Sequence, residues 1–283
     1  MSRPADPHVC LTCGAHVPGD RAAPEVCPTC SDERQYVGLH GQRWQRHSVL
    51  AAEHATVVDP VEPGLYAVGV EPSVAIGQRA LVVCTPEGNL MWDCVGVLTD
   101  AGRDAIAAIG GVRTIAVSHP HFYTGIATVA EALGAEVLLH AADAAHVTHP
   151  HPRIRHWDGE RRGIFGGITL VRAGGHFAGG TVAHWPGGAE RRGALLSGDI
   201  IQVVPDRRFV GFMYSYPNLI PLPLREVERV AASIDDLPFD RIYGGWSDRV
   251  VATGAKGVVA RSVERYRRAL AGRLDGERLP WPT

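Results

Sequence analysis

Two histidines separated by one residue follow an apolar run near the middle of the chain. Residues 114–117 have the pattern of a buried strand, and His119 and His121 stand in the loop between this strand and the predicted helix 125–133. Side chains two residues apart in extended backbone point the same way, so both imidazoles can bind one ion. Imidazole suits zinc or iron. This loop therefore predicts a metal site at the carboxyl end of a strand.

Two further motifs also follow predicted strands. A glycine-rich turn, Gly174-Gly175-His176-Phe177-Ala178-Gly179-Gly180, comes after the strand 168–172, and Ser197-Gly198-Asp199 comes at the end of the apolar run that starts at residue 195. Both motifs place a side chain that can bind a metal just beyond a strand. His176 and Asp199 are therefore further candidate ligands beside the histidine pair.

The order His-x-His, Gly-His-x-x-Gly, Ser-Gly-Asp resembles the metallo-β-lactamase superfamily over residues 50–270. The resemblance implies an α/β (α+β) fold, an αββα sandwich with the metal at one edge between two sheets. It also implies His119, His121 and His176 as ligands, with Asp199 as a further ligand or, if it is not a ligand, as a base.

Three positions depart from the superfamily pattern. Its first motif continues to an aspartate and a histidine that hold a second metal, and these positions are Tyr123 and Thr124 here; its last histidine ligand is replaced by Trp246. The resemblance therefore implies one metal in this domain and a degenerate second site. We expect the Tyr123 hydroxyl to face the cleft as a catalytic hydrogen-bond donor. Asp93 is expected to orient a histidine ligand.

Four of the six cysteines form two pairs near the N-terminus, Cys10-x-x-Cys13 and Cys27-x-x-Cys30. This spacing favours a tetrathiolate metal site and resembles zinc ribbons and rubredoxin-like modules, with zinc or iron as the ion. We expect a module in residues 1–48, with residues 31–44 packing it onto a main domain in residues 49–283. Cys84 and Cys94 are expected to be inert small apolar residues.

Composition limits the partners. The chain has 283 residues, a net charge of −2, 45% hydrophobic and 20% charged residues. This balance gives no reason to expect nucleic acid or a membrane surface as partner. We expect a cytoplasmic protein, since the first residues contain no apolar signal core and no run approaches a membrane span. The aromatic loop Phe209–Pro223 is expected to form a substrate-pocket wall or a packing surface, which includes a homodimer contact.

Three functions fit these motifs. The first is a mononuclear metal hydrolase that uses an activated water on a small substrate such as an ester, thioester or lactone. The second is a non-haem iron redox enzyme, similar to the superfamily's dioxygenases, with His119, His176 and Asp199 as a facial triad and a rubredoxin-like iron at the cysteines. The third is a non-catalytic metal- or ligand-binding protein. Zinc is expected at both sites, with iron as the alternative at either.

Overall fold

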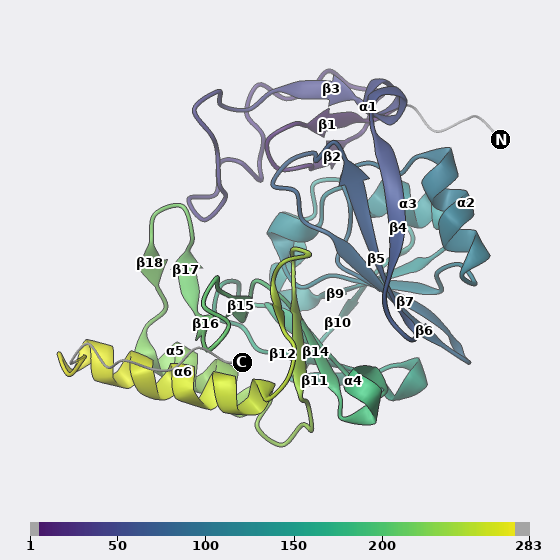
Figure 1. Ribbon diagram of the computed structural model, residues 1–283. Coiled ribbons are helices and arrows are strands. Elements are labelled where there is room, and N and C mark those ends of the chain that lie inside the picture. Colours follow the sequence, from purple (N-terminus) through teal and green to yellow (C-terminus); the bar gives the residue numbers. More distant parts are fainter. Residues whose placement is uncertain (1–5, 275–283) are drawn as a thin grey trace.

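A small N-terminal module lies across one end of a larger sandwich in this computed structural model, which describes residues 6–274 (Figure 1). The module has a three-stranded antiparallel sheet in the order β2 (His16–Val17), β1 (His8–Cys10), β3 (Trp44–Arg46). Helix α1 (His47–Glu53) follows β3 directly and leads into the main domain. The outer ends of the two predicted domains, residues 1–5 and 275–283, lie outside the described range.

The first sheet of the main domain has mixed strand directions. Its neighbours β7, β8, β9 and β10 run parallel, and β4 to β7 form an antiparallel meander. In spatial order its strands are β10 (Ile154–Trp157), β9 (Glu136–His140), β8 (Thr114–Ala116), β7 (Gly88–Trp92), β6 (Ala80–Thr85), β5 (Leu65–Glu71) and β4 (Ala55–Glu62).

The second sheet is antiparallel except for one pair, β14 with β19. In spatial order its strands are β11 (Arg161–Gly163), β12 (Thr169–Arg172), β13 (Thr181–Trp185), β14 (Ala194–Gly198), β19 (Arg241–Gly244) and β20 (Val250–Val251). Two short hairpins extend from the connection between β14 and β19. They are β15 (Gln202–Val203) with β16 (Val210–Gly211), and β17 (Met213–Ser215) with β18 (Ile220–Pro221).

Helices cover the outer face of each sheet. Ile106 of α2 and Ile126 of α3 belong to the apolar cluster of the first sheet, and Val227 of α5 and Val258 of α6 belong to that of the second. A third cluster lies between the two sheets. The predicted αββα sandwich is therefore confirmed. The helices are α2 (Asp100–Ala108), α3 (Ile126–Leu133), α4 (Gly188–Arg191), α5 (Leu224–Ser233) and α6 (Ala255–Leu270), with 3₁₀ turns at Pro120–Phe122, Ala141–His146 and Phe165–Gly167.

Strand β6 shows why the sequence gives two packed layers. Ala80 and Val82 pack toward the helices, whereas Leu81 and Val83 pack toward the second sheet. Successive side chains of a strand point to opposite faces, so a continuous apolar run is needed where both faces are covered. Within residues 6–274, no helix combines the length and apolar character that crossing a bilayer requires.

Candidate metal centre

Strand ends bring the predicted ligands together. His119 and His121 follow β8, His176 lies in the loop between β12 and β13, and Asp199 directly follows β14. The backbone of His119 is extended, with φ −169° and ψ 169°, but Pro120–Phe122 forms a 3₁₀ turn. The loop is therefore half extended and half helical, unlike the extended loop that the sequence suggested.

The three histidines converge on one point. Their ring centroids lie 5.3 Å apart for His119 and His121, 5.1 Å for His119 and His176, and 5.3 Å for His121 and His176. One nitrogen of each ring lies within 4.8 Å of the other two, and the side chains are buried. The sequence-predicted trio is thus a group that could hold a metal ion.

The same nitrogen, Nε2, lacks a hydrogen-bond partner in each ring of the trio. Nδ1 of His176 donates to the carbonyl of Tyr214 at 2.7 Å, and Nδ1 of His119 lies 2.9 Å from Oγ of Ser118. Nε2 of all three rings is buried without a hydrogen-bond partner. A buried polar atom without a partner is costly, and Nε2 of a ring whose Nδ1 donates is a ligand atom. The residues present therefore fit a metal ion.

Asp199 extends the trio. Its Oδ1 lies 3.3 Å from Nε2 of His119 and is also buried without a hydrogen-bond partner. Burial, with a contribution from the nearby charge of Asp93, raises the pKa of Asp199 to about 8. Burial and the neighbouring imidazoles lower the pKa of His119 and His121, so these rings stay neutral. Neutral imidazole is the form that binds a metal, and a cation would favour the charged form of Asp199.

Asp93 contacts Ser118, the residue before His119, and not a histidine ring as predicted. Its Oδ1 accepts a hydrogen bond of 2.7 Å from the backbone N–H of Ser118, which in turn contacts the ring of His119. Gly198 allows this close packing, because a Cβ there would lie 2.5 Å from Oγ of Ser118 and its φ is +55°. A side chain would clash and strain the backbone, which explains the glycine before Asp199.

Three positions differ from the superfamily pattern, and the side chains at two of them, Tyr123 and Thr124, are buried. Tyr123 is 6% exposed and packs in the apolar cluster of the first sheet. It is not among the residues that line the cavity described below. Thr124 is also buried, and its carbonyl accepts a hydrogen bond from the backbone N–H of His16 in the module. Trp246 lines the cavity and donates from Nε1 to the carbonyl of Ile76 at 2.9 Å.

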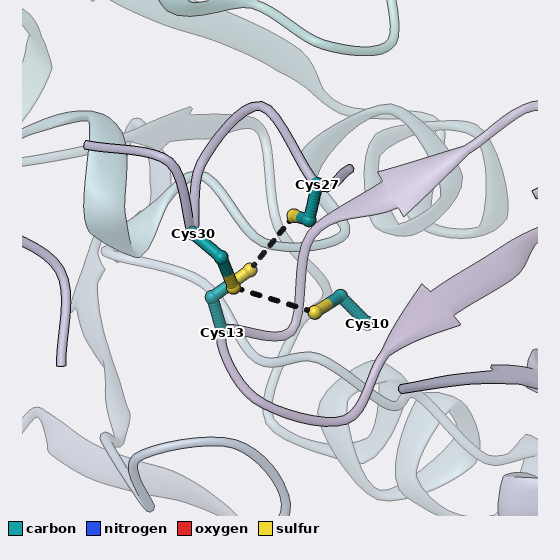
Figure 2. A group of neighbouring side chains, drawn as sticks. All are labelled: Cys10, Cys13, Cys27 and Cys30. Carbon is teal, nitrogen blue, oxygen red and sulfur yellow. Dashed lines mark hydrogen bonds between the residues drawn. The ribbon is translucent and has the colours of Figure 1, made fainter. Parts of the chain in front are cut away.

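The four paired cysteines form a second group that could hold a metal (Figure 2). Sγ of Cys10 lies 3.6 Å from Sγ of Cys30, and Sγ of Cys13 lies 3.6 Å from Sγ of Cys27. These separations are far longer than a disulfide. They are near the ~3.8 Å expected for tetrahedral thiolates at the ~2.3 Å zinc–sulfur distance. Cys94 is buried in the apolar core of the first sheet, which agrees with its prediction as a small apolar residue.

His16 anchors the cysteine module to the main domain. Its Nε2 donates to the carbonyl of Gly96 at 2.7 Å, and its Nδ1 lies 3.0 Å from Oγ1 of Thr128. Because a carbonyl only accepts, Nε2 carries the proton and Nδ1 accepts from the threonine hydroxyl. Burial lowers the pKa of His16 to about 3. The neutral ring is therefore fully hydrogen-bonded at this interface.

A cavity of about 620 Å³ opens beside the histidines, between the module and the main domain. His121, Asp199, Tyr216 and Trp246 line it from the main domain. The module contributes the other wall: Leu11, Thr12, Arg34, Gln35, Tyr36, Gly38, His40, Gly41 and Arg43. The module thus forms part of the cavity itself, a role that the sequence did not indicate.

Different residues of the aromatic loop Phe209–Pro223 fulfil the two predicted roles, as a pocket wall and as a packing surface. Tyr216 and Pro217 line the cavity, whereas Phe212 is buried in the core beneath the second sheet, and Phe209 is also buried. The β17–β18 hairpin stands next to the module (Figure 1), and Tyr214 donates a hydrogen bond of 2.6 Å to Glu33. The loop is therefore both a pocket wall and a packing element.

Two charged residues of the module lie at the histidines, and sequence reasoning missed both. Asp32 and Arg34 form an ion pair of 2.6 Å, and Oδ1 of Asp32 lies 4.0 Å from Nε2 of His121. Burial opposes the charge of Asp32, but hydrogen bonds from Arg34 outweigh it and lower its pKa to about 2. The only local signal was the charged triplet in residues 32–34, one residue beyond Cys30, which also fits a solvated turn.

Comparison with known proteins places the chain in a family. No protein-family model matches it. It is 41% identical over 269 residues to the uncharacterized protein YmaE of Bacillus subtilis (strain 168), covering 94% of this chain and 98% of YmaE. The chain belongs to the YmaE family. The aligned 269 residues are too many to come from the main domain alone, so the similarity extends into the N-terminal module.

Solved structures show the fold of this chain. TMB-1 matches with a TM-score of 0.57 at 13% identity, over 76% of this chain and 99% of TMB-1. VMB-1 matches with a TM-score of 0.55 at 14% identity, over 76% and 98%. A B3 metallo-β-lactamase with an active-site glutamic acid matches with a TM-score of 0.51 at 21% identity, over 80% and 92%. The main domain thus has the metallo-β-lactamase fold, as predicted.

Proposed function

We propose that this member of the YmaE family is a metal-dependent hydrolase whose ion is held by His119, His121, His176 and Asp199. One observation carries the proposal. Three imidazole nitrogens and one carboxylate oxygen are buried, lack hydrogen-bond partners and belong to one cluster. Four such atoms in one place are costly without a cation, whereas a cation satisfies all of them.

The ion supplies Lewis acidity when it is bound, which activates a water molecule and polarises a carbonyl or phosphoryl oxygen. The chain's own residues fix the geometry. The carbonyl of Tyr214 sets the tautomer of His176, and the hydroxyl of Tyr216 donates to the backbone oxygen of Asp199 at 2.5 Å. Phe177 lies against all three imidazoles, at 4.7 to 5.5 Å between ring centroids, and excludes water from that side.

A small molecule is the substrate class that the cavity favours. A volume of about 620 Å³ lies within the range of small-ligand pockets. His121 and Asp199 form one wall, so a substrate in the cavity meets the proposed ion. The walls carry both apolar and hydrogen-bonding side chains, which suits an ester, thioester or lactone with a polar group.

One ion in the main domain and one at the cysteines is the proposed metal content, with zinc favoured at both. The packing of Tyr123 in the core and of Trp246 across the cavity supports a single ion beside the histidines. Four sulfur ligands can also hold iron, which is the alternative ion at the cysteines.

Elemental analysis of protein purified without added metal tests the proposal, combined with assays on nitrophenyl esters, thioesters and lactones. We expect two equivalents of metal, and one after His176→Ala. His184→Ala is the matched control, because this buried histidine donates to the carbonyl of Pro238 at 2.7 Å and lies outside the trio. Turnover should disappear in His176→Ala and persist in His184→Ala. Wild-type protein without metal at the histidines, or unchanged turnover in His176→Ala, would contradict the proposal.

A redox enzyme is a second candidate, favoured by the closeness of the two metal-capable groups. Thr29, between Cys27 and Cys30, and His121 line the same small cavity of about 150 Å³. Electrons would thus cross few residues between the two sites. Iron at both sites, with visible absorption from the cysteine site that bleaches on reduction, would favour this function. Zinc at both sites would rule it out.

A further inference from the structure

A carboxylate from the cysteine module faces the proposed metal site. Asp32 is the second residue after Cys30, and its Oδ1 lies 4.0 Å from Nε2 of His121. This separation is too long for a direct hydrogen bond, but it suits two groups that contact a third between them. Nε2 of His121 has no hydrogen-bond partner of its own. The two atoms are therefore close enough to share one partner between them.

Arg34 holds this carboxylate in place. Oδ1 of Asp32 accepts from the backbone N–H of Arg34 at 2.9 Å and from its Nε at 2.8 Å, and Oδ2 accepts from Nη2 at 2.6 Å. The guanidinium lies 3.7 Å above the ring of Phe177 and donates from Nη1 to the carbonyl of His176 at 2.8 Å. The carboxylate is thus fixed relative to the loop that carries the third histidine.

Space and acceptor capacity remain at this point. Asp32 and His121 both line the 150 Å³ cavity, which is large enough for water. A carboxylate offers about four acceptor positions, and the three hydrogen bonds from Arg34 leave capacity for another donor. Among the residues that line the two cavities around His121, Asp32 and Asp199 are the only carboxylates.

We propose that Asp32 is a positioning residue of the metal centre, whose carboxylate accepts a hydrogen bond from the attacking water and orients it. The inference rests on the proposed hydrolase function. The cysteine module then has a chemical role, because it supplies a group that the main domain lacks on this side of His121. Docking of the module alone would not require a carboxylate beside an unpartnered ligand nitrogen.

Cobalt spectroscopy provides the test. Protein with zinc at the cysteines and cobalt at the histidines is titrated with base, and the visible cobalt absorption is followed. Asp32→Asn keeps the size of the side chain and removes its charge. We expect the pH midpoint of the absorption change to fall by about one unit in Asp32→Asn, because a nearby negative charge disfavours loss of a proton from water. Asp32→Glu, which keeps the charge at a shifted position, should give an intermediate midpoint.

Asp206 provides a matched control. Its Oδ1 accepts from the backbone N–H and Nε of Arg208 at 3.1 and 2.8 Å, the same turn as that of Asp32 and Arg34, but it does not line either cavity. Asp206→Asn should titrate like the wild type. A wild-type midpoint in both Asp32→Asn and Asp32→Glu overturns the role of Asp32 and leaves the hydrolase proposal standing. Wild-type protein that binds no cobalt at its histidines overturns both.

Discussion

The guanidinium of Arg34 donates a hydrogen bond of 2.8 Å to the backbone carbonyl of His176, across 142 residues of sequence. The bond joins the cysteine module to the loop that carries the third histidine, and the stacking of Arg34 on Phe177 strengthens the same contact. Direct contacts therefore connect the module to the histidine cluster. Changes in the module should alter metal binding in the main domain.

Arg34→Ala should weaken metal binding at the histidines by about tenfold, the lower end of what lost supporting contacts cost. The variant frees the His176 loop and leaves Asp32 without its partner. Zinc affinity measured by competition with a chromophoric chelator checks this. Arg208→Ala, in the similar turn outside the cavities, should bind zinc like the wild type. Equal affinities in all three proteins would mean that the His176 loop keeps its position without Arg34.

Cys27→Ser should release one metal equivalent and destabilise the module. Cys27 is buried among the four sulfurs, and a short segment with so small a core depends on its metal for folding. The equivalent at the histidines should remain but bind more weakly, because none of its proposed ligands belongs to the module, whereas the supporting contact of Arg34 with His176 does. Elemental analysis and limited proteolysis check this, with cleavage expected within residues 6–46. Cys84→Ser is the control, since Cys84 lies outside the cluster. Retention of both equivalents in Cys27→Ser would contradict a tetrathiolate site.

Acidification should weaken the protein through His16. Its pKa is about 3 in the folded state against an ordinary value near 6.5, so the unfolded chain binds the proton more tightly. The stabilising contribution of the neutral ring is complete above pH 6.5 and is lost as pH falls toward 3. Between pH 7.5 and 5.5 this loss amounts to about 1.4 kcal/mol.

Urea unfolding of wild type and His16→Gln at both pH values isolates this contribution. Glutamine can still donate to the carbonyl of Gly96 but does not titrate. We expect the free energy of unfolding of His16→Gln to change less with pH than that of the wild type, by about the 1.4 kcal/mol above. Identical pH dependence in both proteins would show that His16 does not govern the interface.

Restoring the superfamily's second-site ligands should fail to restore a second ion. The triple variant Tyr123→Asp, Thr124→His, Trp246→His places a carboxylate at a position that is 6% exposed within an apolar cluster. Burying that charge without a partner is costly, so we expect a lower melting temperature than in the single variant Trp246→His. Elemental analysis should find no additional equivalent. A third equivalent of zinc would show that the Tyr123 position can still reach the metal.

The clustering of the proposed metal ligands was predictable because each lies shortly after the end of a strand. The apolar runs before His119, His176 and Asp199 mark buried strands, and strand ends that meet at one edge bring their loops together. The cysteine pairs were predictable for a similar reason, since their spacing alone brings four sulfurs into one small module. In both cases local pattern determines the position of the functional atoms.

The direction of Tyr123 was not predictable in this way. An extended loop would aim His121 and Tyr123 the same way, whereas a 3₁₀ turn at Pro120–Phe122 rotates successive side chains by about 120°. Tyr123 therefore turns into the core. Asp32 and Arg34 were missed for a different reason. They reach the histidines through tertiary contacts alone, and a charged triplet in a loop carries no periodicity that records such contacts.

The contacts of His16 also impose an order on the maturation of the chain. All four cysteines lie within residues 10–30, ahead of the main domain in the sequence, so a metal can close the module before that domain is made. Gly96, whose carbonyl accepts from the His16 ring, emerges 80 residues after His16. Thr148, whose hydroxyl donates to the backbone carbonyl of His16, emerges 132 residues after it. During translation, a metal-loaded module would thus be folded while its interface with the main domain stays exposed to solvent, until the first sheet is complete. A pause in translation within residues 17–96 would prolong that exposure, whereas a pause after residue 148 would not.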